Sequence, residues 1–130
     1  MNIMKKILIV DDSPTMRRMI KASLRTLENV SFEEAENGLE AIERLTIGAI
    51  DLVTLDINMP DINGLEVLKF IKSHNSLNNI PIIVLSSRSD EQTCDIVLSA
   101  GVARFMNKPF DPHKLNVQVT NLLDNKINAQ

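Results

Sequence analysis

The feature that most constrains the fold is a regular alternation between short apolar runs and stretches in which apolar residues recur with helical spacing. Continuous runs such as Ile7 to Val10 and Ile82 to Leu85 are typical of strands that are covered on both faces of a parallel sheet. Between the runs, apolar residues recur at three- and four-residue steps, as in a helix that buries one face. The alternation therefore predicts strand–helix–strand units with right-handed crossovers.

Counting along the chain gives five strands and five helices in strict alternation. The strands are expected at Ile7 to Val10, Val30 to Ala35, Ile50 to Leu55, Ile82 to Leu85 and Val102 to Met106. The helices are expected to start at Ser13-Pro14, near Leu39, near Leu65, at Asp90 and at Asp111-Pro112. For this length and order, the expected fold is an α/β doubly wound, five-stranded parallel sheet of order 2-1-3-4-5, a flavodoxin-like three-layer sandwich.

Local signals support these boundaries. Ser13 and Asp111 each precede a proline, which is the pattern of an N-cap followed by the first helical residue. Asn37-Gly38 predicts a turn. The helical periods assign Met19, Leu39, Cys94 and Leu98, among others, to buried helix faces.

Composition narrows the class of protein. The chain has 130 residues, of which 44% are hydrophobic, so it has the size and apolar content of one globular domain, expected over residues 1–130. A net charge of −3 argues against nonspecific binding to nucleic acid or to an anionic membrane. A single cysteine excludes an internal disulfide, and no apolar run approaches the length of about 20 residues that spans a bilayer. A cytoplasmic protein is expected.

Polar residues follow the predicted strands where each strand ends. Asp11-Asp12 follows the first strand, Asp56 the third and Ser86 the fourth, and Lys108 comes just after the fifth. The carboxyl ends of parallel strands share one edge of the sheet, and ligands bind there beside the point at which the strand order reverses. In the order 2-1-3-4-5 this point lies between the first and third strands. The acidic residues are therefore expected to converge there, with Ser86 and Lys108 facing them.

Three crowded carboxylates repel one another unless a cation lies among them. Oxygen ligands of this kind favour a hard divalent ion, Mg²⁺ or Mn²⁺, which can also hold phosphate oxygens. One carboxylate could then act as a nucleophile and take up a phosphoryl group as an acyl phosphate. An ammonium from Lys108 and a hydroxyl from Ser86 would stabilise the charge that spreads over the phosphoryl oxygens.

Each of these residues taken alone has an ordinary structural explanation. An Asp-Asp pair after a strand is usually a solvated turn or a helix cap, and a serine at a strand end can cap a helix. The combined placement at the ends of four strands favours function, because chance would scatter polar residues over both edges of the sheet. Cys94, by contrast, is expected only to pack.

At these residues the chain closely resembles the receiver domain of two-component response regulators, the CheY-like family. The resemblance extends from Lys6 to about Leu123. The matching stretches are Ile7 to Asp12 with Ser13 to Arg18, Leu55 to Pro60 with Gly64 to Glu66, Leu85 to Ser87, and Gly101 through Phe105 to Lys108-Pro109-Phe110.

The resemblance implies a role for each residue that binds metal or phosphate. Asp56 corresponds to the phosphorylated aspartate and also contributes to the metal site. Asp12 corresponds to the main metal ligand, Asp11 acts partly through water, and the backbone carbonyl of Asn58 completes the site. Lys108 would pair with the phosphoryl group.

The resemblance also implies a switch. The Lys108–Pro109 bond is expected to be cis. Ser86 would move toward the phosphoryl oxygen, and Phe105, at a position where chemotaxis-type members often carry Tyr, would swing inward. The altered surface would be the fourth helix, fifth strand and fifth helix. Arg88 is basic where the chemotaxis archetype is acidic, so phosphoryl lifetime and phosphatase recognition would differ.

The function implied is that of a stand-alone response regulator without an output domain, with the chemotaxis type as the expected subtype. It would accept a phosphoryl group from a sensor histidine kinase or phosphotransfer domain and then bind a downstream protein, with no nucleic-acid or membrane partner. It would be a monomer or a phosphorylation-dependent dimer. It would not be an enzyme in the usual sense, because it would catalyse only its own phosphorylation and dephosphorylation.

Two alternatives stay open. A phosphatase of the haloacid-dehalogenase type also uses a strand-end Asp with Mg²⁺ and Lys, but it places a second Asp where this chain has Asn58. A receiver that acts as a scaffold without phosphate is the other alternative.

Overall fold

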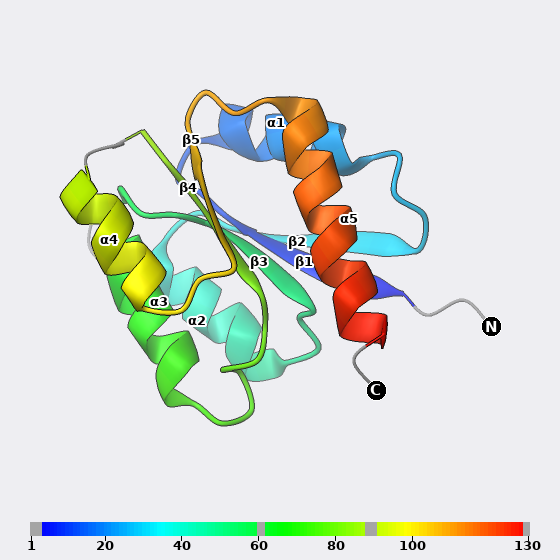
Figure 1. Ribbon diagram of the computed structural model, residues 1–130. Helices are drawn as coiled ribbons and strands as arrows, with labels where there is room; N and C mark the ends of the chain where they lie inside the picture. The colour runs from blue at the N-terminus through cyan, green and yellow to red at the C-terminus, as the bar shows by residue number, and fades with distance from the viewer. Residues whose placement is uncertain (1–3, 60–61, 88–90, 129–130) are drawn as a thin grey trace.

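A computed structural model describes residues 4–59, 62–87 and 91–128 of the chain, with the backbone alone for residues 125–128. It contains a five-stranded parallel sheet of order β2-β1-β3-β4-β5 (Figure 1). The strands are β1 (Lys5–Val10), β2 (Val30–Ala35), β3 (Leu52–Asp56), β4 (Ile82–Ser86) and β5 (Arg104–Asn107). The helices are α1 (Pro14–Leu24), α2 (Gly38–Ile47), α3 (Gly64–Ser73), α4 (Glu91–Ser99) and α5 (Pro112–Asn128). The predicted fold class and strand order are confirmed.

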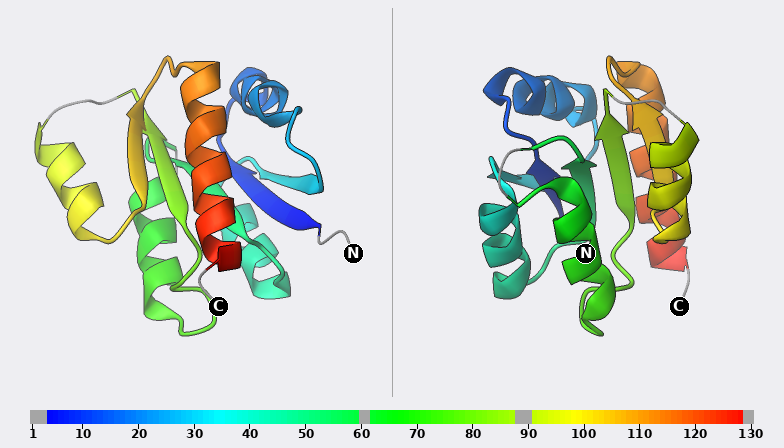
Figure 2. Two further views of the ribbon diagram at one scale, coloured as in Figure 1. Left: turned by 45° about the vertical axis from the view of Figure 1, so that its right-hand side comes forward. Right: turned by 90° about the vertical axis from the view of Figure 1, so that its left-hand side faces the viewer.

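Helices cover both faces of the sheet, so the molecule has three layers (Figures 1 and 2). Alternate residues of each strand point to opposite faces. Ile7 and Ile9 of β1 belong to the apolar cluster under α1 and α5, whereas Leu8 and Val10 belong to the cluster under α2, α3 and α4. All four of these side chains are fully buried. Burial on both faces explains why the end of β1 is an uninterrupted apolar run.

The predicted caps at Ser13 and Asp111 are confirmed. The Ser13 hydroxyl accepts a hydrogen bond from the Met16 backbone N–H at 3.1 Å. The Asp111 carboxylate accepts from the backbone N–H groups of His113 and Lys114 at 2.9 and 3.2 Å. These bonds satisfy N–H groups that have no partner inside the helix, and they fix where each helix leaves the sheet edge.

Asn37-Gly38 is not an isolated turn, contrary to the prediction. Asn37 is the N-cap of α2, and its side chain accepts from the Glu40 backbone N–H at 2.8 Å. Gly38 is the first residue of that helix. A Cβ at Gly38 would lie 2.3 Å from the Ile62 carbonyl oxygen, so glycine is needed there for close packing rather than for a turn conformation.

Three apolar residues that were assigned to buried helix faces are exposed. Met19, Leu39 and Leu98 lie on the solvent side of α1, α2 and α4. One position along a helix turns the side chain by about 100°. Met19 and Leu98 each stand one position from a fully buried residue, Ile20 and Val97 respectively, and are therefore rotated off the core face.

Leu39 likewise follows a buried residue, Gly38, and is rotated off the core face of α2, and Cys94 on α4 is only half-buried.

Some predicted boundaries also shift. The third strand begins at Leu52 and includes Asp56, and the fifth begins at Arg104, two residues later than predicted. The predicted helix start at Asp90 lies outside the described residues. Among the residues that the structure describes, no helix combines the length and apolarity needed to traverse a lipid bilayer.

Candidate functional site

The three acidic residues predicted at the strand ends come together. Asp11 and Asp12 follow β1 and Asp56 ends β3, and these two strands are hydrogen-bonded neighbours with Val10 opposite Leu55. Each residue offers a carboxylate oxygen that lies within 4.8 Å of those of the other two. Asp11 and Asp56 are buried and Asp12 is exposed. The cluster is therefore open to solvent on the side of Asp12.

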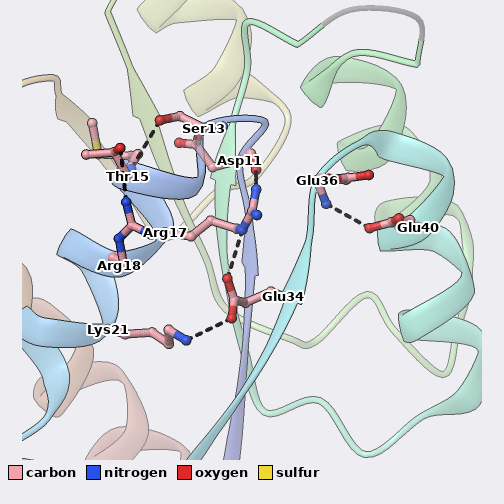
Figure 3. A network of polar contacts seen from close by, with 10 residues as sticks. Asp11, Ser13, Thr15, Arg17, Arg18, Lys21, Glu34, Glu36 and Glu40 are labelled. Atoms are coloured by element: carbon pink, nitrogen blue, oxygen red, sulfur yellow. Dashed lines mark hydrogen bonds and ion pairs between the residues drawn. The ribbon is translucent and has the colours of Figure 1, made fainter.

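Asp11 is held by its backbone and by both carboxylate oxygens. Its N–H donates to the Ala35 carbonyl at 3.0 Å, and its own carbonyl accepts from Arg17 Nη1 at 2.7 Å (Figure 3). Oδ1 accepts from the Ser13 N–H at 2.9 Å, and Oδ2 pairs with Lys108 Nζ at 2.8 Å. With 1% of its surface exposed, Asp11 is a rigid part of the site.

Asp56 is 4% exposed and is less strongly held than Asp11. Its Oδ1 accepts from the Asn58 backbone N–H at 3.0 Å and lies 3.4 Å from Lys108 Nζ. Burial raises the pKa of the Asp56 carboxyl above its ordinary value, against the opposing effects of the Asn58 N–H and the Lys108 charge, and the nearby Asp11 charge adds to the increase. The anion at Asp56 is therefore under-stabilised by the protein alone.

Lys108 joins the acidic cluster to β4. Its ammonium lies between the Asp11 and Asp56 carboxylates, and its backbone N–H donates to the Ser86 carbonyl at 2.8 Å. The Lys108–Pro109 peptide bond is cis, the configuration that the family resemblance implies.

Ser86 is fully buried at the end of β4, one residue after Leu85, which pairs with Asp56 of β3. Its hydroxyl accepts from the Asn58 side-chain amide at 3.3 Å, and the same amide reaches the Ser87 hydroxyl at 3.4 Å. Asn58 thus bridges the loop after β3 to the end of β4, a side-chain contact that sequence reasoning did not anticipate.

Phe105 stands apart from the acidic cluster. It is half-buried on β5 and packs against the apolar cluster under α2, α3 and α4. Arg88, singled out in the sequence for access to the phosphoryl group, lies outside the described residues.

A glycine allows the loop after β3 to pass close to α3. A Cβ at Gly64 would lie 2.4 Å from the Asp56 carbonyl oxygen and 2.6 Å from the Ile57 Cα atom. Both neighbours are backbone atoms that cannot move aside, so a larger residue would displace the segment that carries Asp56 and Asn58. The N–H of Gly64 also donates to the Ile57 carbonyl at 3.1 Å.

Arg17 is a site residue to which the sequence pattern assigned no role. It lies on the first turn of α1, and its side chain contacts both the Asp11 carbonyl and Glu34 of β2 (Figure 3). Its position four residues after the N-cap Ser13 is the only local signal, and that signal does not identify the partners.

The chain is similar in sequence to known proteins. The family model of the response regulator receiver domain matches residues 7–120. Chemotaxis protein CheY1 of Helicobacter pylori strain J99 is 41% identical over 111 residues, which cover 85% of this chain and 90% of the relative. A chemotaxis protein CheY homolog of Campylobacter jejuni is 37% identical over 119 residues, covering 91% and 92%.

Solved structures are also similar. Chemotaxis protein CheY4 of Vibrio cholerae has a TM-score of 0.83 at 28% identity, and the match covers 92% of this chain and 99% of that one. The family match spans most of the chain, and the curated relatives exceed 30% identity over nearly their full length. The chain therefore belongs to the receiver-domain family of two-component response regulators and is of the CheY type.

Proposed function

We propose that this receiver accepts a phosphoryl group on Asp56 from a sensor histidine kinase or phosphotransfer domain, with a divalent cation, and then switches its affinity for a downstream protein. The observation that carries the proposal is the buried Asp56 carboxylate at the sheet edge, with Asp11, Asp12 and Lys108 around it. The names of the relatives support a chemotaxis-type role.

The donor set fits Mg²⁺ or Mn²⁺. Asp11, Asp12 and Asp56 contribute three carboxylates within 4.8 Å, and Lys108 is the cation that contacts two of them. An excess of negative charge in a partly dry site, offered entirely by oxygen ligands, is what a hard divalent ion requires. We assign the ion to Asp12, Asp56 and the Asn58 backbone carbonyl, with Asp11 acting partly through water. When bound, it neutralises charge on the phosphoryl oxygens.

Asp56 is better suited to nucleophilic attack than Asp11. Both oxygens of Asp11 are engaged, by Ser13 and Lys108. The contacts that described residues make with Asp56, from Asn58 and Lys108, both reach Oδ1. We therefore assign the attack to Oδ2. A bond forms from this oxygen to phosphorus as the bond from phosphorus to the donor histidine nitrogen breaks, and the nitrogen leaves with the electron pair.

Lys108 and Ser86 would then contact the new phosphoryl group. The Lys108 ammonium already lies 3.4 Å from Asp56 and can follow the added charge. Ser86 would donate its O–H to a phosphoryl oxygen, a bond separate from the one that its oxygen accepts from the Asn58 amide. Because the Lys108 N–H is bonded to the Ser86 carbonyl, the two residues are mechanically linked through β4 and β5.

The target surface we propose is formed by α4, β5 and α5. A cavity of about 360 Å³ lies between β5 and α5, lined by Phe105, Phe110, Arg104 and Lys114 among others. An inward movement of Phe105 would reshape this cavity, and the two phosphorylation states would thus differ in affinity for a partner by the contacts formed there.

The phosphatase alternative is weaker than the receiver. Its second Asp would stand at position 58, where the Asn58 amide instead holds Ser86 and Ser87. Members of the receiver family are signalling domains, and this chain belongs to that family. A scaffold that acts without phosphate is the remaining alternative. Phosphoryl labelling of the wild-type protein tests it, because a scaffold of this kind would take up no label.

The first prediction concerns the acceptor. Asp56→Asn should abolish uptake of a phosphoryl group from acetyl phosphate with Mg²⁺, because an amide cannot form the acyl phosphate. Intact-protein mass and loss of the label with hydroxylamine measure this. Asp95→Asn, an exposed acid on α4, is the matched control and should label normally. Labelling that persists in Asp56→Asn would refute the assignment of Asp56, and an unlabelled wild type would favour the scaffold.

The second prediction concerns the cation. Millimolar Mg²⁺ should raise the melting temperature of the wild type by several degrees, because an ion that binds only the folded state stabilises it. Asp12→Ala should lose this shift, since Asp12 is exposed and its removal leaves the folded core intact. Thermal unfolding with and without chelator measures both. An equal shift in wild type and Asp12→Ala would contradict the metal site.

The third prediction concerns pH in the presence of chelator. The pKa of Asp56 is raised by folding, so the protonated carboxyl favours the folded state and this contribution is lost as pH rises through the raised pKa. Asp56→Asn should therefore melt at a higher temperature than wild type at about pH 7.5, and the gap should narrow toward about pH 4.5. Melting curves at a series of pH values measure the difference in melting temperature between Asp56→Asn and wild type. If this difference is constant across the pH range, the charge of Asp56 is not its cause.

The fourth prediction concerns the switch. Lys108→Ala should still accept phosphate, but slowly, and its α4–β5–α5 surface should not respond. Hydrogen–deuterium exchange with and without beryllofluoride measures the response in the described part of this surface, 91–124. Lys69→Ala on the exposed side of α3, outside this surface, is the control and should respond as wild type does. A full response in Lys108→Ala would remove Lys108 from the switch.

A further inference from the structure

Arg17 connects the acidic cluster to the neighbouring edge strand. Its side chain is 13% exposed, so the guanidinium lies largely inside the protein. Nη1 donates to the backbone carbonyl of Asp11 at 2.7 Å, and Nε donates to Glu34 Oε1 at 2.8 Å (Figure 3). One planar group is thus fixed by an acceptor after β1 and by an acceptor on β2. The fork geometry of arginine suits such a double contact.

The carbonyl that Arg17 holds has a special place in the site. It belongs to the peptide that joins Asp11 to Asp12, so the orientation of that peptide governs where both carboxylates point. Asp11 is also held by its own N–H and by Ser13 and Lys108. Asp12 is exposed on the open side of the cluster, and the Arg17 contact restrains the peptide immediately before it.

Glu34 keeps Arg17 in place. Its second oxygen accepts from Lys21 Nζ at 2.8 Å, so the carboxylate lies between two cations of α1 (Figure 3). Hydrogen bonding to Lys21, and then to Arg17, holds the pKa of Glu34 below its ordinary value despite partial burial. Glu34 therefore stays ionised at neutral pH and offsets the guanidinium charge, which would otherwise oppose a cation bound nearby.

We propose that Arg17 is a positioning residue for the divalent-cation site, with Glu34 as its anchor: the guanidinium holds the Asp11–Asp12 peptide in the orientation that presents both carboxylates to the ion. The inference rests on the proposed function, since it requires the cation site. Hydrogen-bonding groups behind the ligands of a metal typically change its affinity by about 10- to 100-fold when removed.

Two neighbouring arginines provide matched controls. Arg18 is the next residue of α1, is exposed, and makes a long 3.5 Å contact with Thr15. Arg44 lies on α2 and approaches Glu33, the β2 residue next to Glu34, at 4.0 Å. Replacing either one by glutamine removes the same charge as Arg17→Gln does, without touching the Asp11 carbonyl.

The test is the Mg²⁺ dissociation constant, measured by isothermal titration calorimetry well below the melting temperature. Arg17→Gln should weaken binding by about 10-fold or more. Arg17→Lys should also weaken it, because one ammonium cannot reproduce the two-acceptor fork. Glu34→Gln should have a smaller effect in the same direction. Arg18→Gln and Arg44→Gln should bind within about twofold of wild type, a change below the range expected for a supporting residue.

A kinetic measurement separates positioning from general loss of structure. The rate of labelling by acetyl phosphate in Arg17→Gln should fall at low Mg²⁺ and recover at saturating Mg²⁺, because the acceptor Asp56 is intact. If Arg17→Gln is too unstable to study, the Mg²⁺ dissociation constant and the labelling rate are measured for Arg17→Lys and Glu34→Gln instead.

The outcomes distinguish this inference from the proposed function. Wild type that binds no Mg²⁺ would overturn both. Wild type that binds Mg²⁺ while Arg17→Gln and Arg17→Lys bind equally well would overturn the role of Arg17 and leave the cation site standing. Weakened binding in Arg18→Gln or Arg44→Gln of the same size as in Arg17→Gln would also overturn it, because net charge alone would then explain the effect.

Discussion

Mutual repulsion of three carboxylates at one edge of the sheet is the constraint around which this protein is organised. Asp11, Asp12 and Asp56 approach within 4.8 Å, and two of them are almost fully buried. Lys108 lies between Asp11 and Asp56 and reduces the repulsion, but burial, with a smaller contribution from the Asp11 charge, still raises the pKa of Asp56. A site left with excess negative charge attracts a divalent cation, and a cation in turn brings phosphate oxygens to Asp56.

The rest of the fold holds the carboxylates against this repulsion. The sheet is covered on both faces, and the apolar clusters on either side keep β1 and β3 in register up to the acidic ends. Beyond the strands, the backbone is held by short contacts: Ser13 and Arg17 hold Asp11, and Gly64 lets the loop after β3 pass close to α3. Rigid support of this kind keeps ligand oxygens in place before any ion binds.

The same contacts couple the acidic cluster to the surface formed by α4, β5 and α5. Lys108 is bonded to Ser86 through the backbone, and Ser86 to Asn58 through side chains. A phosphoryl group added at Asp56 would attract the Ser86 hydroxyl and would compete with Asp11 for Lys108. Ser86 ends β4 and Lys108 follows β5, next to the proposed target surface. A change in charge at Asp56 could therefore alter the structure of that surface through these two residues.

Much of this could be predicted from the sequence because it depends on local pattern. Uninterrupted apolar runs such as Ile7 to Val10 indicate strands buried on both faces, and their alternation with helical periods, together with the chain length, favours the order 2-1-3-4-5 that the structure has. The position of Asp56 at a strand end places it at the shared edge, and a serine before a proline marks the start of α1. The strand and the helix start are inferred from residues within a few positions of one another, whereas the strand order is inferred from the alternation along the whole chain.

Tertiary structure decided the rest, because the partners are distant in the sequence or the geometry is not periodic. Arg17 meets Glu34, 17 residues away, and Asn58 meets Ser86, 28 residues away, and no spacing rule links either pair. Leu98 has the character of a core residue but is rotated away from it, and Asn37 caps a helix although its sequence resembles a turn. The sequence by itself determined the sheet and the acids at its edge. Only packing between elements determined which side chains hold those acids in place, since hydrogen bonds depend on distances that residue order does not encode.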